Sequence, residues 1–376
     1  MTKVLNLIFI CSFLIIISFP TLSMLSDVTL KKSDFENRSL APFPNLAQYS
    51  KELNLLPDAL LYFYNDHFGF RKKMIKMKTK VEANLFSLHS NIYMLQGKND
   101  FYFLNPIRPK STDPNLNYNT LFFTADELKT IKEVLEKEDA WFKQRNIAYM
   151  FVIIPDKEAV YPEYFPYPNH IITSFKLDQL KDYLEHNSTF RLVDIRQTLI
   201  DAKDEKIVFY YKGDSHWNEY GAFFAYQEIM RKLSHVNPKV YVPQLDDFEI
   251  QTKDNEIITG DIVRIGKLSE GGYEIQTRLI PKPEFASRKK LKKVFIYGDS
   301  FAKNMIEGEP VGLVPFLHYS FEDVYEEHFE TPVQQQRNEI SPLEFDLIAK
   351  EKPELVIREI IQRNMRILLG PEYRIQ

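Results

Sequence analysis

Short apolar runs alternate with longer amphipathic stretches along most of the chain. Runs rich in β-branched and aromatic residues predict buried strands, and they lie at 149–154, 191–195, 207–211, 294–297 and 355–361. Stretches with apolar residues at helical spacing predict helices, at 53–70, 71–86, 124–145, 174–185 and 220–234. Strands that alternate with helices favour parallel βαβ units. The pattern therefore predicts an α/β fold with a mostly parallel central sheet.

Three further signals refine this picture. Alternation over 92–104 around the Gly97–Asp100 turn predicts a hairpin. Thr124 and Glu127 have the spacing of a capping box, which predicts where the helix at 124–145 begins. Residues 241–290 are charged and weakly patterned. We expect them to be an insertion with hairpins and loops in a single domain that spans residues 26–376.

The N-terminus has the pattern of a targeting segment. Lys3 precedes a run at 4–19 that is apolar apart from Asn6, Ser12 and Ser18. Residues 1–25 are therefore either a signal peptide with a cleavage site near 21–23, or an uncleaved membrane anchor. Both alternatives keep Lys3 inside and export the rest of the chain. The expected location is the outer face of the cytoplasmic membrane, the periplasm or the medium, with membrane association through the N-terminus.

Composition narrows the chemistry. The chain has 376 residues, of which 44% are hydrophobic, enough for a sizeable core. A formal net charge of −4 gives no indication of a nucleic-acid partner. The single cysteine, Cys11, lies in the N-terminal segment. The exported part therefore has no disulfide, no thiol nucleophile and no cysteine-based metal site.

The first candidate for chemistry is a strand that ends in a sharp turn. The predicted strand at 294–297 runs into Gly298-Asp299-Ser300, and residues 301–305 can start a helix. Side chains in such a turn lie at the carboxyl edge of the sheet, where open α/β sheets bind ligands. Amides at a helix N-terminus could also stabilise an oxyanion there. Taken alone, a simple N-cap by Asp299 or Ser300 explains the turn as well.

A second Gly-Asp-Ser turn lies upstream. The predicted strand at 207–211 leads to Asp214, Ser215 and His216. In extended chain Asp214 and His216 project to the same side, so the carboxylate can hold one ring nitrogen and leave the other as a base for a serine. Ser215 would point away from both, which makes Ser300 the better nucleophile. A cap followed by a half-buried aromatic pair is the alternative interpretation.

Together these stretches resemble a known family. Gly-Asp-Ser-Phe after a buried strand is similar to the first block of the SGNH (GDSL-type) hydrolases, and Asp-x-His-Trp resembles the SGNH-like polysaccharide O-acetyltransferases. The alginate acetylation proteins AlgJ and AlgX typify that group, and DHHW-type proteins are related to it. Segments 36–44, 63–71 and 155–163 also fit, in the same order. The resemblance covers roughly residues 35–370 and implies an SGNH-like three-layer α/β/α fold. Because Asp214 and His216 precede Ser300, the motif order is circularly permuted relative to classical SGNH hydrolases.

The resemblance implies roles for three of these residues. Ser300 would be the nucleophile, His216 its base and Asp214 the residue that orients the base. The implied activity moves an acetyl group through a serine acyl-enzyme onto hydroxyls of an exopolysaccharide or cell-wall polysaccharide, without a cofactor. An exported domain has no acetyl-CoA, so the family implies a membrane-bound O-acyltransferase as the acetyl supplier. The amide of Ser300 is the first oxyanion donor to consider, and Asn304 is a second.

Other residues near these motifs have open roles. Trp217 and Tyr220 either form a sugar-stacking wall or pack beside the triad. Lys157 follows a strand end and could touch substrate, although a lysine that fixes a loop or lies on the surface is the better interpretation. His67 is more consistent with a hydrogen-bonded structural histidine than with a second base.

Three rival functions remain in view. A carbohydrate acetylesterase would use the same triad with water as the acceptor. A catalytically silent polysaccharide-binding or assembly subunit would not need the intact Asp/His/Ser set. A metal site at Asp214 and His216 lacks a third ligand in the sequence pattern.

Overall fold

The computed structural model describes fourteen ranges of the chain: residues 2–24, 32–33, 38–44, 56–71, 73–74, 77, 94–105, 122–166, 172–204, 207–258, 260–266, 272–306, 309–327 and 343–370. The chain divides into two compact units. One unit comprises Met1–His89 and Val263–Glu270, and the other comprises Ser90–Ile262 and Gly271–Gln376.

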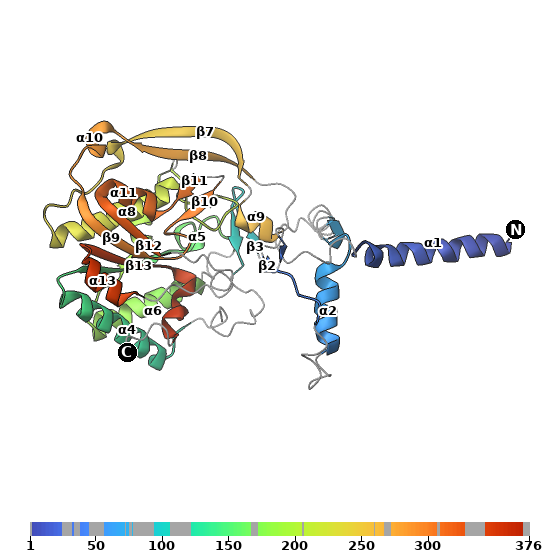
Figure 1. The fold of residues 1–376 in the computed structure, drawn as a ribbon. Helices are drawn as coiled ribbons and strands as arrows, with labels where there is room; N and C mark the ends of the chain where they lie inside the picture. Colours follow the sequence, from blue (N-terminus) through green and yellow to red (C-terminus); the bar gives the residue numbers. More distant parts are fainter. Residues whose placement is uncertain are drawn as a thin grey trace. The chain divides into compact units, whose positions relative to one another are not determined.

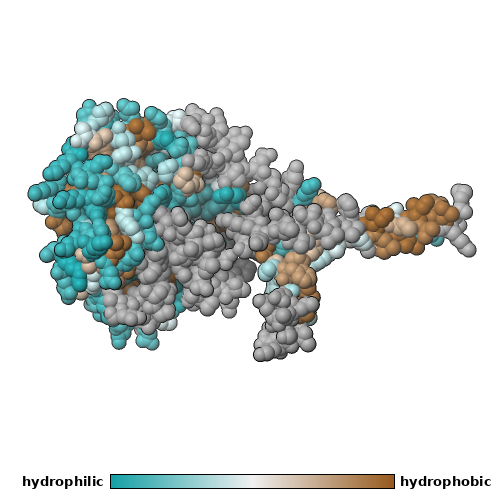
Figure 2. Space-filling view, viewed as in Figure 1, coloured by the Kyte–Doolittle hydropathy of each residue, from teal (hydrophilic) through white to brown (hydrophobic). Residues whose placement is uncertain are grey.

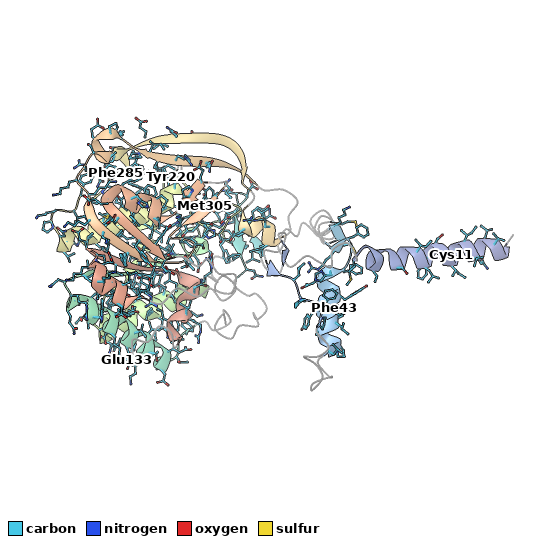
Figure 3. The ribbon with its side chains drawn as sticks, viewed as in Figure 1. Cys11, Phe43, Glu133, Tyr220, Phe285 and Met305 are labelled. Atoms are coloured by element: carbon cyan, nitrogen blue, oxygen red, sulfur yellow. The ribbon has the colours of Figure 1, made fainter. Side chains whose placement is uncertain are left out.

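The first unit contains the apolar N-terminal helix. Helix α1 (Thr2–Ser23) is hydrophobic over its described length and carries Cys11, which is exposed (Figures 2 and 3). Strands β1 (Lys32–Ser33) and β2 (Arg38–Ser39) pair antiparallel, and α2 spans Leu56–His67. Most of the helix predicted at 71–86 lies outside the described residues. The assignment of residues 1–25 as a signal peptide or anchor stays a prediction.

Among the helices of the described ranges, none combines the length and the apolar character that crossing a bilayer requires.

His67 has a structural environment at the end of α2. Its Nε2 lies 3.0 Å from the carbonyl oxygen of Ala41, and its ring stacks at a tilt on Phe63. The neighbouring Asp66 carboxylate accepts the amide of Ala41 at 2.8 Å. These contacts fit the expectation of a hydrogen-bonded structural histidine.

The second unit is built on a five-stranded sheet. Its order is β12 (Phe321–Glu327), β9 (Leu291–Tyr297), β13 (Leu355–Ile361), β5 (Ala148–Ile154) and β6 (Val193–Asp194), and every neighbouring pair is parallel (Figure 1). Strands β13 and β5 pair along their full lengths, from Leu355 opposite Ala148 to Ile361 opposite Ile154. The predicted parallel α/β sheet is confirmed.

Helices cover both faces of this sheet. The β5 side chains alternate, so that Val152 packs in one core, while Phe151 and Ile153 pack in another. The first core takes in helices α7 (Arg196–Asp201), α8 (Glu219–Val236) and α11 (Leu313–Ser320). The opposite face packs on α4 (Ala125–Lys143), α6 (Ile172–Asn187), α13 (Phe345–Glu351) and the 3₁₀ segment η6 (Gln362–Leu369). The result is the predicted three-layer α/β/α arrangement.

The remaining elements are short or belong to hairpins. They are β3 (Met94–Gln96), β4 (Tyr102–Leu104), α5 (Lys157–Val160), η5 (Leu245–Asp247), β7 (Phe248–Ile258), α9 (Asp261–Gly266), β8 (Gly272–Pro281), α10 (Pro283–Ala286), β10 (Asn304–Ile306) and β11 (Glu309–Val311). The β3–β4 hairpin confirms the predicted turn, where Asn99 and Asp100 have φ values of 54° and 62°. Strands β7 and β8 form a hairpin in the expected insertion at 241–290.

Two predictions of local structure were wrong. Residues 207–211 are not a sheet strand: Tyr210 forms a single bridge with Trp217, and the segment folds back on itself. No helix opens after Ser300 either. Asp299 accepts the amides of Phe301, through Oδ1, and of Ala302, through its carbonyl, which closes one tight turn. The chain then enters β10, and α11 begins only at Leu313.

Candidate active site

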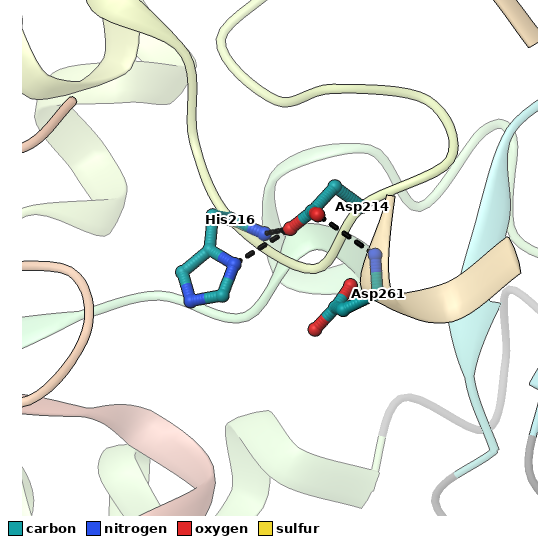
Figure 4. Close-up of side chains that lie close together, drawn as sticks. All are labelled: Asp214, His216 and Asp261. Atoms are coloured by element: carbon teal, nitrogen blue, oxygen red, sulfur yellow. Dashed lines mark hydrogen bonds and ion pairs between the residues drawn. The ribbon is translucent and has the colours of Figure 1, made fainter. Parts of the chain in front are cut away.

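Asp214 and His216 lie where the 209–218 segment turns back. The bridge between Tyr210 and Trp217 brings the two ends of the segment together. One oxygen of Asp214, Oδ1, accepts both the backbone N–H of His216 at 2.9 Å and its ring Nδ1–H at 2.6 Å (Figure 4). The two-residue spacing therefore places the carboxylate against the imidazole, as predicted.

Ser300 completes a hydrogen-bonded series. It lies in the turn directly after β9, and its Oγ is 2.7 Å from Nε2 of His216. An ionised carboxylate only accepts hydrogen bonds, so Nδ1 of His216 carries the ring proton and Nε2 is left to accept from the serine hydroxyl. Ser300 is exposed, whereas His216 and Asp214 are only 8% and 1% exposed. This is the geometry of a reachable nucleophile backed by a buried base.

The charges of the pair reinforce each other. Burial alone would raise the pKa of Asp214, but the charge and hydrogen bond of His216 hold that pKa well below its usual range. Burial likewise works to lower the pKa of His216, yet Asp214 and then Asp261 outweigh it, so the His216 pKa is raised. The site thus stabilises the imidazolium that forms when the base takes a proton.

The serine turn is tied to the neighbouring strand β13. The Asp299 carboxylate accepts the amide of Phe301 at 2.9 Å and the amide of Ile361 at 2.8 Å. Glu359, which is fully buried in β13, accepts the amide of Asp299 at 3.1 Å. A Cβ at Gly298 would lie 2.7 Å from the Cβ of Ala302 and 2.6 Å from that Glu359 carboxylate, so the turn needs glycine there. Burial and the charge of Asp299 raise the pKa of Glu359 well above its usual range.

Possible oxyanion donors are few. The amide of Phe301 is already bound to Asp299, whereas no described residue accepts the amide of Ser300. The Oδ1 of Asn304 accepts the amide of Met305, and none of the contacts between described residues joins Asn304 to the triad. Because no helix opens after Ser300, the argument from a helix N-terminus fails. The Ser300 amide is the donor that the geometry leaves available.

Lys157 fixes a loop. Its side chain is 3% exposed, and Nζ donates to the carbonyl oxygens of Tyr211 at 3.0 Å, Lys212 at 3.0 Å and Asp214 at 2.7 Å. A buried ammonium with these three acceptors is not presented to a substrate. Of the roles considered for Lys157, these contacts favour loop fixation over a substrate contact.

The two aromatic residues after His216 differ in exposure. Trp217 is 1% exposed and packs edge-to-face on Phe301, with ring centroids 5.3 Å apart. Its ring has no free face for a sugar, so packing beside the triad is the correct alternative for Trp217. Tyr220 is partly exposed near the start of α8, labelled in Figure 3, and its amide donates to the N-cap Asn218. Tyr220 alone keeps the surface that stacking on a sugar requires.

Three residues at the site were not foreseen. They are Asp261, Glu359 and Arg363. The guanidinium of Arg363 lies 5.6 Å from the centre of the Phe301 ring and pairs with Asp156 at 2.5 Å. Asp261 could have been identified from a repeated sequence pattern. The chain contains three Gly-Asp pairs, at 213–214, 260–261 and 298–299, and all three aspartates converge here. Glu359 lies in the apolar strand β13 and Arg363 follows that strand, and neither residue belongs to a recognisable sequence motif.

Asp261 also supplies the third potential metal ligand, beside Asp214 and His216, that the sequence pattern lacked. Their ligand atoms lie within 4.8 Å of one another. However, Asp214 already accepts three N–H groups, and both oxygens of Asp261 accept from Ser215. A cation would have to displace these donors, so the contacts favour a hydrogen-bonded network over a metal centre.

Comparison with known proteins agrees with this geometry. Residues 123–362 match the family model described as the SGNH hydrolase-like domain of the acetyltransferase AlgX. Similar solved structures include PatB1 of Bacillus cereus, at 14% identity over 75% of this chain and 99% of that chain with a TM-score of 0.50. Another is the O-acetyltransferase domain of Pseudomonas putida AlgJ, at 15% identity over 73% and 92% with a TM-score of 0.44. No curated protein matches the chain at a significant level. Since the family model spans more than half of the sequence, the chain belongs to the family of SGNH hydrolase-like acetyltransferase domains represented by AlgX.

Proposed function

We propose that this protein is an extracytoplasmic O-acetyltransferase that moves an acetyl group through a Ser300 acyl-enzyme onto hydroxyls of an exopolysaccharide or cell-wall polysaccharide. The observation that carries the proposal is the continuous series of hydrogen bonds from buried Asp214 through His216 to exposed Ser300. It lies inside the part of the chain that matches the acetyltransferase family.

The first half-reaction loads the enzyme. His216 takes the proton of Ser300 as Oγ attacks the carbonyl carbon of an acetyl ester, and the Ser300 amide donates to the oxyanion. The tetrahedral intermediate collapses, the bond to the donor oxygen breaks, and His216 returns its proton to that oxygen. Asp214 stabilises the positive charge on the ring between these two steps.

The second half-reaction passes the acetyl group on. A sugar hydroxyl approaches the exposed ester of Ser300, and His216 removes its proton. The new C–O bond forms as the bond to Oγ breaks, and His216 reprotonates Ser300. Water in the place of the sugar would give an esterase, so the acceptor that reaches the acyl-enzyme first decides the outcome.

The proposed location determines the donor. The pattern of residues 1–25 supports export, and an exported enzyme has no acetyl-CoA. A membrane-bound O-acyltransferase that carries acetyl groups across the membrane is the partner we propose. Solved structures that resemble this chain include one named as an O-acetyltransferase domain, which agrees with transfer chemistry.

The test uses the full-length protein with a chromogenic acetyl ester, in the presence and absence of an oligosaccharide acceptor. Wild type is compared with Ser300→Ala and His216→Ala, with Ser215→Ala as the matched serine control, and products are identified by mass spectrometry. We expect acetylated oligosaccharide from wild type, and a loss of about 10⁴–10⁶ in rate for Ser300→Ala and His216→Ala. Because Ser215 faces Asp261 and not His216, Ser215→Ala should lose much less.

Three other outcomes would point elsewhere. Serine-dependent acetate release that no acceptor diverts would favour the esterase. Equal behaviour of wild type and Ser300→Ala would reject the triad and favour a binding or assembly subunit. A loss in Ser215→Ala as large as in Ser300→Ala would reject the assignment of the nucleophile.

A further inference from the structure

We propose that Asp261 is a positioning residue of the triad, supplied by the β7–β8 insertion, which clamps Asp214 and Ser215 so that His216 is held in line with Ser300. The inference rests on the proposed serine chemistry and goes beyond it, because Asp261 touches neither the nucleophile nor the base. It acts on the two residues that precede His216.

The clamp works in both directions. The backbone N–H of Asp261 donates to Oδ2 of Asp214 at 2.8 Å (Figure 4). Its carboxylate accepts from the next residue, with the Ser215 amide at 2.6 Å on one oxygen and the Ser215 hydroxyl at 2.6 Å on the other. One residue thus binds the carboxylate of Asp214 and the backbone that carries it.

The clamp leaves Asp214 with one orientation. Oδ1 of Asp214 serves the backbone and the ring of His216, so Oδ2 needs a separate donor. Without the Asp261 amide, the buried Asp214 carboxylate could rotate about its last torsion and lose its alignment with Nδ1. Burying a carboxylate with an unsatisfied oxygen is also costly.

Gly260 shows how closely the two segments approach. A Cβ at this position would lie 2.3 Å from the carbonyl oxygen of Gly213 and 2.6 Å from the amide nitrogen of Asp214. Both of these are backbone atoms that cannot swing aside. The Gly-Asp pair at 260–261 is therefore shaped for contact with the Gly-Asp pair at 213–214.

Lys157 completes the hold from the other side of the same loop. Its ammonium binds the carbonyl oxygens of Tyr211, Lys212 and Asp214, while Asp261 binds the amide of Ser215. The Lys157 ammonium thus binds carbonyl oxygens of the loop, and the Asp261 carboxylate binds an N–H group of the same loop. Lys157 follows β5 at the carboxyl edge of the sheet, whereas Asp261 comes from the insertion. The insertion therefore has a role at the site.

The experiment compares Asp261→Ala and Asp261→Asn with wild type in the full-length protein. Asp246→Asn is the matched control, because Asp246 is an exposed aspartate of the same insertion. Three quantities are measured: kcat and KM on the acetyl ester, the pH profile of kcat/KM, and the rate at which a sulfonyl fluoride labels Ser300, followed by mass spectrometry. Thermal unfolding shows that each variant is folded at the assay temperature.

We expect Asp261→Ala to lower kcat and Ser300 labelling by about 10²-fold, the loss typical of a misplacement near 1 Å, with little change in KM. Both variants keep the backbone N–H that binds Asp214, but Asp261→Asn also keeps one side-chain acceptor for Ser215, so it should retain more activity than Asp261→Ala. The charges that face His216 are Asp214, Asp261 and Arg363. Removing the negative charge of Asp261 should move the acid limb of the kcat/KM profile to lower pH. Losing a residue with a purely structural role would leave the limb in place.

The outcomes separate this inference from the proposed function. If Asp261→Ala labels Ser300 like wild type, with an unshifted pH profile, the positioning role is overturned even if acetyl transfer is observed. If labelling falls and the profile shifts as expected while wild type transfers no acetyl group, the clamp stands and the acetyltransferase proposal fails. Equal losses of kcat and of Ser300 labelling in Asp261→Asn, Asp261→Ala and the Asp246→Asn control would also overturn the positioning role of Asp261.

Discussion

At the scale of residues, the proposed role of His216 as the base makes activity depend on its protonation state. A base must be neutral, so activity rises as pH increases through the His216 pKa, which Asp214 raises above that of an ordinary histidine. We predict an acid limb of kcat/KM above pH ~6.5, the value typical of free histidine. Asp214→Asn should move this limb to lower pH and greatly reduce kcat, as measured by acetate release across pH.

The same pair makes stability depend on pH, with opposite signs for its members. The lowered pKa of Asp214 gives stability that is present above its unfolded value and is lost as pH falls through the folded value. The raised pKa of His216 gives stability that is present below its unfolded value and is lost as pH rises through the folded value. The melting temperature of wild type should therefore exceed that of Asp214→Asn by the largest amount in mildly acidic solution. A difference that grows steadily towards alkaline pH would contradict the pairing.

Site residues could be predicted from sequence where a short motif carries the chemistry, as at Asp214 and His216 and in the Gly-Asp-Ser turn that ends at Ser300. Asp214 and His216 are two residues apart, so local geometry alone brings them together. The clamp by Asp261 joins positions 47 residues apart and depends on how the insertion folds. The burial of Trp217 likewise depends on Phe301, which lies in the turn after β9, and no periodicity in the sequence indicates that contact.

At the scale of elements, the central strands of the sheet could be predicted because they are buried on both faces. Strand β13 is buried along its whole length and was predicted with its observed bounds. Strand β12 was missed, because it lies at the sheet edge and four of its seven residues are acidic and exposed or partly exposed. Residues 207–211 looked like a strand, but they are buried by pairing within their own loop.

A buried ion pair links the sheet to helix α4. Arg358 of β13 contacts Glu138, which also accepts the hydroxyl of Tyr149, and the two charged side chains are 1% and 2% exposed. We predict that Glu138→Ala lowers the free energy of unfolding by about 3–5 kcal/mol, because it removes the carboxylate that pairs with a buried guanidinium. Chemical denaturation measures this, and the residual folded enzyme should keep its kcat.

The control for this prediction lies on the same helix. Lys143→Ala breaks an i,i+4 pair with Asp139 whose lysine is 67% exposed, and it should cost no more than about 0.5 kcal/mol. A similar cost for Glu138→Ala and Lys143→Ala would mean that the buried pair adds little to stability.

At the scale of the whole molecule, three neighbouring strands deliver the site. Ser300 follows β9, Glu359 and Arg363 lie at the end of β13, and Lys157 follows β5. Because these strands are parallel and adjacent, their carboxyl ends meet at one edge, where open α/β sheets bind ligands. Asp214 and His216 come from a loop and Asp261 from the start of α9, all outside the sheet, so the sheet positions the proposed nucleophile and the other segments bring the proposed base to it.

Export of this molecule is the remaining prediction. Lys3 before an apolar run should keep the N-terminus inside and send the body outward. We predict that an alkaline phosphatase fused after Gln376 is active in cells, because this reporter needs disulfides that form only outside the cytoplasm. Removing residues 2–25 should abolish that activity without lowering the amount of fusion protein, as judged by immunoblot. Full reporter activity without residues 2–25, or none with them, would reject export by this segment and with it the need for an acetyl supplier across the membrane.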